Sequence, residues 1–160
     1  MKRQDIITSP ELSKKLKAAG IIVEPLIGFW YELRRVYKDH DQQRLARSKN
    51  KILRWEFNLP KDKLPLYSST SFSDEIGSYK LELSDRIPAY TADELMGYLP
   101  VKIKIDDDYI RFIEIQGDII TIYYKSENTS FILGETVVDT NLTSAVARMI
   151  VSLKMLGCRN

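Results

Sequence analysis

The chain has 160 residues, of which 44% are apolar and 29% are charged, and it is long enough to bury a core. Its one cysteine, Cys158, excludes an internal disulfide and any metal site built from several cysteines. No apolar run approaches the roughly 18–20 residues that span a bilayer, and residues 1–7 show no signal-peptide pattern. We therefore expect a cytoplasmic protein that forms a single domain over residues 1–160.

The net charge of +2 is unevenly distributed along the chain. Residues 1–64 carry 15 Lys and Arg against 8 Asp and Glu, whereas residues 65–160 carry 9 against 14. The asymmetry suits an anionic partner for the basic part, but it also suits attraction between the halves or head-to-tail pairing in a dimer. The stretch 61–73, which contains Pro and Ser, is the best candidate linker if the chain instead forms two lobes, 1–64 and 74–160.

A helix and a strand are the first elements that the sequence predicts. Ser9 and Pro10 are typical of a helix start, and Gly20 is typical of a helix end. Residues 28–37 alternate between two sets of side chains, which indicates a strand with a large apolar content. Residues 38–51 are polar throughout, so we expect either a long exposed loop or a weak helix there.

The clearest alternation of apolar and polar residues in the chain comes next. It predicts a half-buried strand over residues 53–59, with Trp55 in the core, and Pro60 ends that strand. The apolar set consists of Leu53, Trp55, Phe57 and Leu59. A further strand is expected around residues 79–83, which also alternate.

A short helix is predicted in the middle of the chain. Thr91 and Glu94 have the spacing of a capping box, in which each side chain accepts a hydrogen bond from the other residue's backbone N–H. Pro100 prevents this helix from continuing.

The last third of the chain reads as a strand meander followed by a helix. Gly117 marks a tight hairpin, and a kink is expected at Gly134 in the last strand. The expected strands cover residues 101–105, 109–115, 119–125 and 131–137. Residues 142–156 place apolar side chains at helical spacing, so they predict an amphipathic helix.

Together these elements predict an α+β fold with antiparallel sheets. An N-terminal helix, a short middle helix and a C-terminal amphipathic helix accompany the sheets, and the C-terminal helix packs on one of them. Ile110 and Phe112 lie on one face of a middle strand and Ile113 and Ile115 on the other. The face that the helix does not cover then needs another layer or a partner.

The sequence offers little reactive chemistry. His40 is the only histidine, which makes a catalytic triad or a two-histidine zinc site improbable. His40 lies in a polar segment, Asp106–Asp108 have the composition of an exposed turn without calcium-loop spacing, and Cys158 lacks a neighbouring base. We therefore predict no catalytic, cofactor-binding or metal-binding residues and no cofactor.

Basic residues interleaved with aromatic ones in the first half are the basis for an alternative, nucleic-acid binding. Such a combination can stack bases and hold phosphates. The candidate contacts are Arg34, Arg44, Arg47, Lys49 and Lys51. The final helix does not add to this interpretation, because its first turn carries Asp139 and no basic residue.

The C-terminal helix has a second, weaker apolar edge formed by Val151 and Met155. These residues lie away from the centre of its apolar stripe, so we expect them to contribute to a subunit contact.

Residues 87–95, with the motif Ile-Pro-Ala-Tyr-Thr-Ala-Asp-Glu-Leu, and Leu99-Pro100 are similar to a stretch found in small uncharacterised proteins of bacterial phages and prophage-like elements. The strand meander and the final helix over residues 142–150 extend the resemblance, which covers residues 79–157. The resemblance implies a small α+β protein of unassigned role with no catalytic residues. We predict a non-catalytic phage- or mobile-element-type protein that binds a protein partner, including its own chain, and not a membrane.

Overall fold

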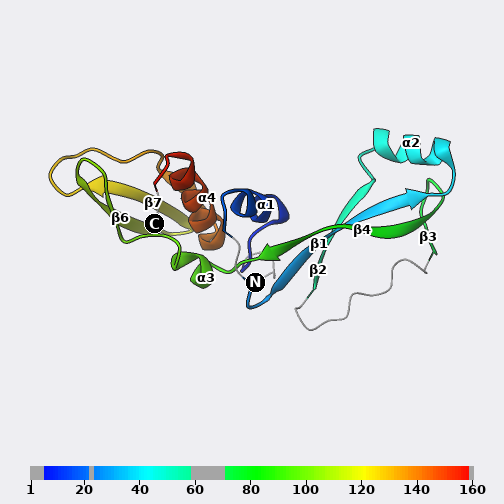
Figure 1. Cartoon of the computed structure of the whole chain (residues 1–160), viewed down its shortest axis with the longest axis horizontal. Coiled ribbons are helices and arrows are strands. Elements are labelled where there is room, and N and C mark those ends of the chain that lie inside the picture. Colours follow the sequence, from blue (N-terminus) through cyan, green and yellow to red (C-terminus); the bar gives the residue numbers. More distant parts are fainter. Residues whose placement is uncertain (1–5, 22–23, 59–70, 159–160) are drawn as a thin grey trace. The chain divides into compact units, whose positions relative to one another are not determined.

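The computed structural model describes residues 6–21, 24–58 and 71–158 of the chain. Its contacts divide the chain into two compact units (Figure 1). The terminal unit comprises residues 1–26 and 89–160, and the inserted unit comprises residues 27–88. The two units contain four helices and two antiparallel sheets, which confirms the predicted α+β class. None of the helices in the described ranges is long and apolar enough to cross a membrane.

The terminal unit is built around a four-stranded sheet with the strand order β5-β6-β7-β8. Helix α4 contacts β7 and β8, and helices α1 and α3 contact α4. In chain order the elements are α1 (Pro10–Ala18), α3 (Ala92–Met96), β5 (Lys102–Lys104), β6 (Asp108–Gln116), β7 (Ile119–Ser126), β8 (Val137–Asp139) and α4 (Leu142–Met155).

The helices of this unit begin and end at residues suited to capping. The side chains of Ser9, Thr91 and Asn141 accept hydrogen bonds from backbone N–H groups in the first turns of α1, α3 and α4. Gly20 and Gly157 follow α1 and α4 with φ of 82° and 76°, a left-handed conformation that glycine adopts without strain. The capping box predicted at Thr91 is confirmed.

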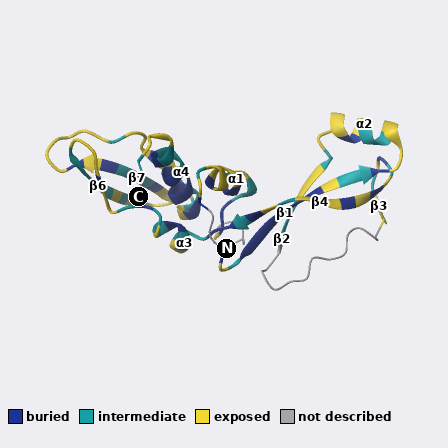
Figure 2. Cartoon of the chain, viewed as in Figure 1, coloured by how far each residue is buried: buried dark blue, intermediate teal, exposed yellow. Residues whose placement is uncertain are grey.

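The core of the terminal unit lies where α4 faces the sheet and the other helices (Figure 2). Tyr124 is fully buried and donates to the carbonyl of Pro100, and burial raises the pKa of its phenol. The largest buried side chains of this core are Leu16, Tyr90, Leu95, Ile122, Tyr124, Val137, Val146, Met149 and Ile150. The predicted stripe of α4 is buried except at its ends, where Leu142 and Leu156 are partly exposed.

The β6–β7 hairpin predicted at Gly117 is present, and its turn is two residues long. Gln116 pairs with Ile119, and Gly117 between them has a φ of 60°. The prediction of one strand over residues 131–137 is wrong. Ile132 makes only an isolated bridge to Lys125, and regular pairing returns in β8. The intervening Gly134 has a φ of 65°, which takes the chain out of the extended conformation that pairing requires.

The inserted unit has a four-stranded sheet with the order β2-β1-β4-β3. Its elements are β1 (Gly28–Tyr37), α2 (His40–Ser48), β2 (Leu53–Asn58), β3 (Ser71–Ser73) and β4 (Ser78–Ala89). Leu33, Tyr37, Tyr79 and Leu81 of the sheet form a core with Ala46 of α2. This core is smaller than that of the terminal unit, as expected for a shorter stretch of chain.

Of the two alternatives predicted for residues 38–51, the helix is present as α2. The Asp39 carboxylate accepts from the backbone N–H groups of Asp41 and Gln42 at 2.8 and 3.2 Å, so it caps the helix. Only Ala46 of this helix is buried, which explains why the sequence shows no apolar stripe there.

The predicted strand is present as β2, but the prediction that Trp55 lies in the core is wrong. Leu53 is exposed, and Trp55 and Phe57 are half-buried. The alternation that suggested a core strand is real, but β2 lies at the edge of its sheet, where fewer neighbours cover a side chain. Leu59 lies outside the described residues.

The boundaries of the compact units, at residues 26–27 and 88–89, differ from those suggested for two lobes, 1–64 and 74–160. Most of the stretch 61–73, the predicted linker, lies outside the described residues. The terminal unit carries 12 Lys and Arg against 13 Asp and Glu, and the inserted unit carries 12 against 9. The compact units therefore have net charges of −1 and +3, a much smaller difference than that between the two sequence halves.

Candidate functional site

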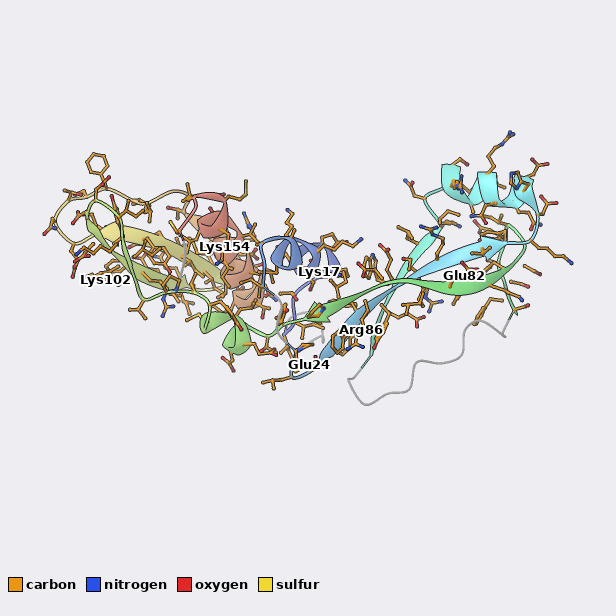
Figure 3. The ribbon with its side chains drawn as sticks, in the orientation of Figure 1. Lys17, Glu24, Glu82, Arg86, Lys102 and Lys154 are labelled. Atoms are coloured by element: carbon orange, nitrogen blue, oxygen red, sulfur yellow. The ribbon has the colours of Figure 1, made fainter. Side chains whose placement is uncertain are left out.

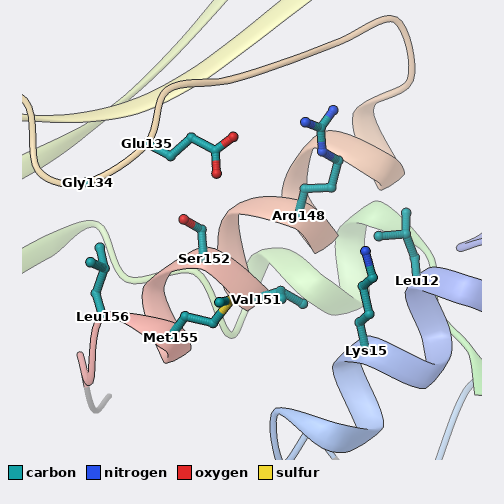
Figure 4. A pocket seen from close by; sticks show the side chains of 9 residues that line it. All are labelled: Leu12, Lys15, Gly134, Glu135, Arg148, Val151, Ser152, Met155 and Leu156. Atoms are coloured by element: carbon teal, nitrogen blue, oxygen red, sulfur yellow. The ribbon is translucent and has the colours of Figure 1, made fainter.

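An open groove runs between α1 and α4 of the terminal unit (Figure 4). Its apolar lining comes from Leu12 of α1 and from Val151, Met155 and Leu156 at the end of α4, and its volume is about 660 Å³. We call it the α1–α4 groove. A smaller hollow of about 440 Å³, lined by Ala18, Val151 and Met155 among others, continues it along α1.

The two residues predicted to form a subunit contact both line this groove. Met155 is 84% exposed, one of the most exposed large apolar side chains in the described part of the protein. Val151 lies one helical turn earlier and is half-buried, because its other side packs against the core. The sequence distinguished these two residues from the buried stripe, and the structure brings them together.

Leu156, also in the groove, was predicted as part of the core stripe but is 51% exposed. It lies against Gly134, where an added Cβ atom would be 2.4 Å from the Leu156 Cδ1 atom. The absent side chain at Gly134 and its positive φ therefore let the chain pass close to the end of α4. Sequence reasoning interpreted Gly134 only as a kink and missed this contact.

Charged side chains border the α1–α4 groove. Lys15 lies on α1 on one side and Glu135 on the other, with α4 between them (Figure 4). Arg148 donates to the backbone carbonyl of Val138 at 3.1 Å and to Asp139 at 3.3 Å. Among the described residues, neither Lys15 nor Glu135 forms an ion pair, so both charges remain open to a partner.

The prediction that both faces of the middle strands carry apolar residues also holds for the face away from α4. Phe112 and Tyr123 stack there with their ring centroids 5.3 Å apart, and Tyr123 donates to Glu114 at 2.6 Å. Ile119 and Val138 on the same face are exposed. Lys102 bridges Asp108 and Glu127 at 2.7 and 2.8 Å at one end of the sheet (Figure 3).

The five basic residues predicted to contact nucleic acid all lie in the inserted unit. Arg34 of β1 and Arg47 of α2 line the same hollow. Arg44 and Lys49 are exposed but do not line it, and Lys51 is paired with Glu75. The structure therefore brings two of the five together in one site.

This hollow, the Arg34–Arg47 hollow, has a volume of about 510 Å³. Its other lining residues are Gln43, Asn50, Ile52 and Leu53. Arg34 pairs with Leu53 in the β1–β2 register, and Arg35 donates its backbone N–H to Ile52 at 2.8 Å, so the sheet fixes one wall. Helix α2 supplies Gln43 and Arg47, which are four residues apart and share a helix face.

A polar network close to this hollow was not predicted. The Asp74 carboxylate accepts from Arg35 at 2.8 Å and from the Tyr37 hydroxyl at 2.7 Å. It also accepts from the backbone N–H groups of Ile76 and Gly77 at 2.9 and 3.3 Å. Burial opposes ionisation, but the bonds from Tyr37 and the two backbone groups and the Arg35 charge outweigh it and lower the pKa of Asp74. The one sequence signal was an Asp three residues before a Gly, which is typical of a turn.

The remaining reactive residues have local structural roles or none. His40 is exposed in the first turn of α2, and Cys158 is half-buried beyond α4. Asp107 accepts from the Ser126 hydroxyl and from the Asn128 amide at 2.6 Å, which ties two turns together. The described residues contain no group of three or more His, Cys, Asp or Glu residues placed to hold a metal ion.

Comparison of the chain with protein-family models, curated proteins and solved structures found no match. The resemblance to phage-encoded proteins therefore stays a prediction, and function is inferred from the geometry.

Proposed function

We propose that the protein acts without catalysis, through protein–protein contact, and that the α1–α4 groove receives a second copy of the chain. The observation that supports this most directly is the exposure of Met155, which continues the apolar lining of a groove between two helices. The resemblance of residues 79–157 suggests a phage- or mobile-element-type protein, and we propose the cytoplasm as its location.

Charge complementarity favours a second copy as the occupant. In a two-fold dimer the same surface patch serves both subunits, so each contact is made twice. With the two α4 helices parallel to each other and to the two-fold axis, Lys15 of one copy faces the side of the groove that carries Glu135 in the other. The groove thus carries both members of an ion pair that only a second copy would complete.

The apolar area in the groove supports a dimer that forms at high protein concentration. Full burial of one large apolar side chain contributes about 1.5–3 kcal/mol. Met155 and Leu156 are the exposed apolar residues here, so two copies bury four such side chains. That gain is comparable with the roughly 4–15 kcal/mol that association costs, so we expect weak, concentration-dependent association.

Sedimentation velocity over a wide range of protein concentrations tests the proposal. We expect wild-type protein to shift from monomer to dimer, and Met155→Lys to remain monomeric with an unchanged thermal midpoint. Leu26→Lys is the matched control, because Leu26 is 82% exposed in the same unit but does not line the groove. Val151→Asp is a poorer test, since Val151 also packs against the core.

A charge swap tests the two-fold arrangement itself. Lys15→Glu is expected to weaken the dimer by placing like charges together, and the double variant Lys15→Glu with Glu135→Lys is expected to restore it. Wild-type protein that stays monomeric at the highest concentration would exclude self-association. Equal loss of dimer in the Met155 and Leu26 variants would show that the groove is not the contact.

A further inference from the structure

We propose that the Arg34–Arg47 hollow of the inserted unit binds the phosphate of a nucleotide, either free or within a single-stranded nucleic acid. This site is independent of the α1–α4 groove, because all its residues lie in the other unit.

The polar lining of the hollow favours an anion. Arg34 and Arg47 each carry a guanidinium with five N–H donors, and Gln43 and Asn50 carry amides. The Gln43 Oε1 atom accepts the backbone N–H of Tyr37 at 2.8 Å, which orients the amide and leaves its two N–H donors. Within the described ranges, no carboxylate lines the hollow. Two guanidinium groups and amide donors around one space match the oxygen atoms of a phosphate.

Some neighbouring cations of the same unit have carboxylate partners, whereas these two arginines have none among the described residues. Arg35 pairs with Asp74 at 2.8 Å, and Arg54 pairs with Glu56 at 2.8 Å. Within the described residues, neither Arg34 nor Arg47 forms an ion pair or a side-chain hydrogen bond. Arg35 and Arg54 are therefore engaged within the unit, whereas the positive charges of Arg34 and Arg47 line the hollow without a carboxylate partner among the described residues.

The end of helix α2 nearby does not oppose an anion strongly. Free carbonyl groups at a helix C-terminus carry partial negative charge. Here Lys49 and Lys51 donate their backbone N–H groups to the carbonyls of Leu45 and Ala46, and Asn50 donates to that of Arg47. Asn50 has a φ of 53°, the left-handed conformation that allows this capping. Three carbonyls of the last turns are thus engaged within the helix end.

The remaining lining suits the rest of a nucleotide. Ile52 is half-buried and Leu53 is 49% exposed, so they offer an apolar surface beside the donors. Guanidinium groups also stack on bases. A volume of about 510 Å³ lies in the range of small-molecule sites. Inorganic phosphate would use the donors alone, whereas a nucleotide would use both surfaces.

Fluorescence anisotropy with a labelled single-stranded 12-mer oligonucleotide, and competition by AMP and by inorganic phosphate, tests the proposal. We expect Arg47→Gln to weaken oligonucleotide binding about tenfold, which matches the loss of one charge-assisted contact. Arg44→Gln is the matched control, because Arg44 lies on the same helix and carries the same charge but does not line the hollow. We expect it to weaken binding less than threefold. Arg47→Lys, which keeps the charge but not the bidentate geometry, is expected to fall between them.

The competitors distinguish the source of the phosphate. Displacement of the oligonucleotide by AMP would support a site for a free nucleotide, and binding that AMP does not displace would support a site for the nucleic-acid backbone. No binding of either probe at low salt would overturn the proposal. Equal loss in the Arg44 and Arg47 variants, or equal displacement by poly-glutamate, would overturn it as well, because both indicate general attraction of anions.

Discussion

Asp74→Asn is the substitution that best tests the polar network of the inserted unit. The carboxylate of Asp74 is the shared acceptor for Arg35, Tyr37 and two backbone N–H groups. Asparagine keeps the shape of the side chain but replaces one of the two oxygens with an NH₂ group. Either Arg35 and Tyr37 or the two backbone groups then face a donor in place of an acceptor.

The expected cost follows from these contacts. Hydrogen bonds to a charged group contribute about 1.5–3 kcal/mol, and Tyr37 can rotate its hydroxyl to recover part of the loss. Arg35 cannot, and its Nε group is already buried without a partner in the described structure. Because the Asp74 side chain is 20% exposed, solvent reduces the penalty. We expect the free energy of unfolding to fall by about 2–3 kcal/mol, and Tyr37→Phe to lower it by about 1 kcal/mol.

The pH dependence provides a second measurement. The pKa of Asp74 is lower in the folded protein than in the unfolded chain, so its stabilising effect is complete above the ordinary carboxyl pKa of about 3.9. The effect is lost as the pH falls through the lower, folded value. Wild-type protein should therefore lose its advantage over Asp74→Asn below about pH 4. The pKa of Glu75 is also lowered, chiefly by its bond to Lys51, and the Asp74 charge opposes that shift only as the last of its causes, so most of the Glu75 effect is common to both proteins.

Urea unfolding followed by tryptophan fluorescence isolates this unit, because Trp30 and Trp55, the only tryptophans, both lie in it. Glu82→Gln is the control, since Glu82 is an exposed carboxylate on β4 in the same sheet (Figure 3). We expect its unfolding midpoint to match that of wild type. If Asp74→Asn behaves like Glu82→Gln, or keeps the wild-type pH dependence below pH 4, the network does not stabilise the unit as argued.

Three further predictions concern packing, capping and backbone conformation. Met149→Ala removes a fully buried side chain between α4 and its sheet. We expect the free energy of unfolding, followed by circular dichroism, to fall by about 2–5 kcal/mol. Thr91→Ala removes the N-cap of α3 and should lower the free energy of unfolding by about 1 kcal/mol. Glu94→Ala should cost more in the same thermal melts, because Glu94 accepts from Leu26 and from Thr91. In urea unfolding, Asn50→Gly should leave the free energy of unfolding unchanged or raise it. Asn50→Val should lower it by about 1–2 kcal/mol, because a branched side chain is strained at positive φ.

Elements whose signals are local were predicted well. Ser9, Thr91 and Gly157 act through backbone groups within a few residues, so their types alone indicate where a helix begins or ends. The β6–β7 hairpin is similar, because its two-residue turn fixes the register of both strands. In these segments the local preference and the global fold agree.

Features that depend on partners distant in sequence were not predictable in the same way. The alternation in residues 53–59 correctly indicates a strand, but it does not say that β2 lies at a sheet edge. Arg35 and Asp74 are 39 residues apart, and only the fold brings them together. The candidate sites show the same contrast between local signals and contacts of residues distant in sequence. Met155 was distinguished by helical periodicity alone, whereas separating Arg47 from Arg44 required the position of α2 beside β1 and β2.

The pairing of charges explains why the basic composition of the first half was an incomplete guide to function. Of the cations in the inserted unit, Arg35, Lys51 and Arg54 have carboxylate partners. They therefore contribute little to the electrostatic potential outside the unit. Arg34 and Arg47 share a hollow that no carboxylate of the described residues lines, so their charge is available to the ligand that we propose. The number of basic residues does not distinguish pairing within the unit from contact with a ligand. The carboxylates around each basic residue do. By the same reasoning, Lys15 and Glu135 border the α1–α4 groove without an ion-pair partner in the described part of the chain, which makes both of them candidates for contact with another chain.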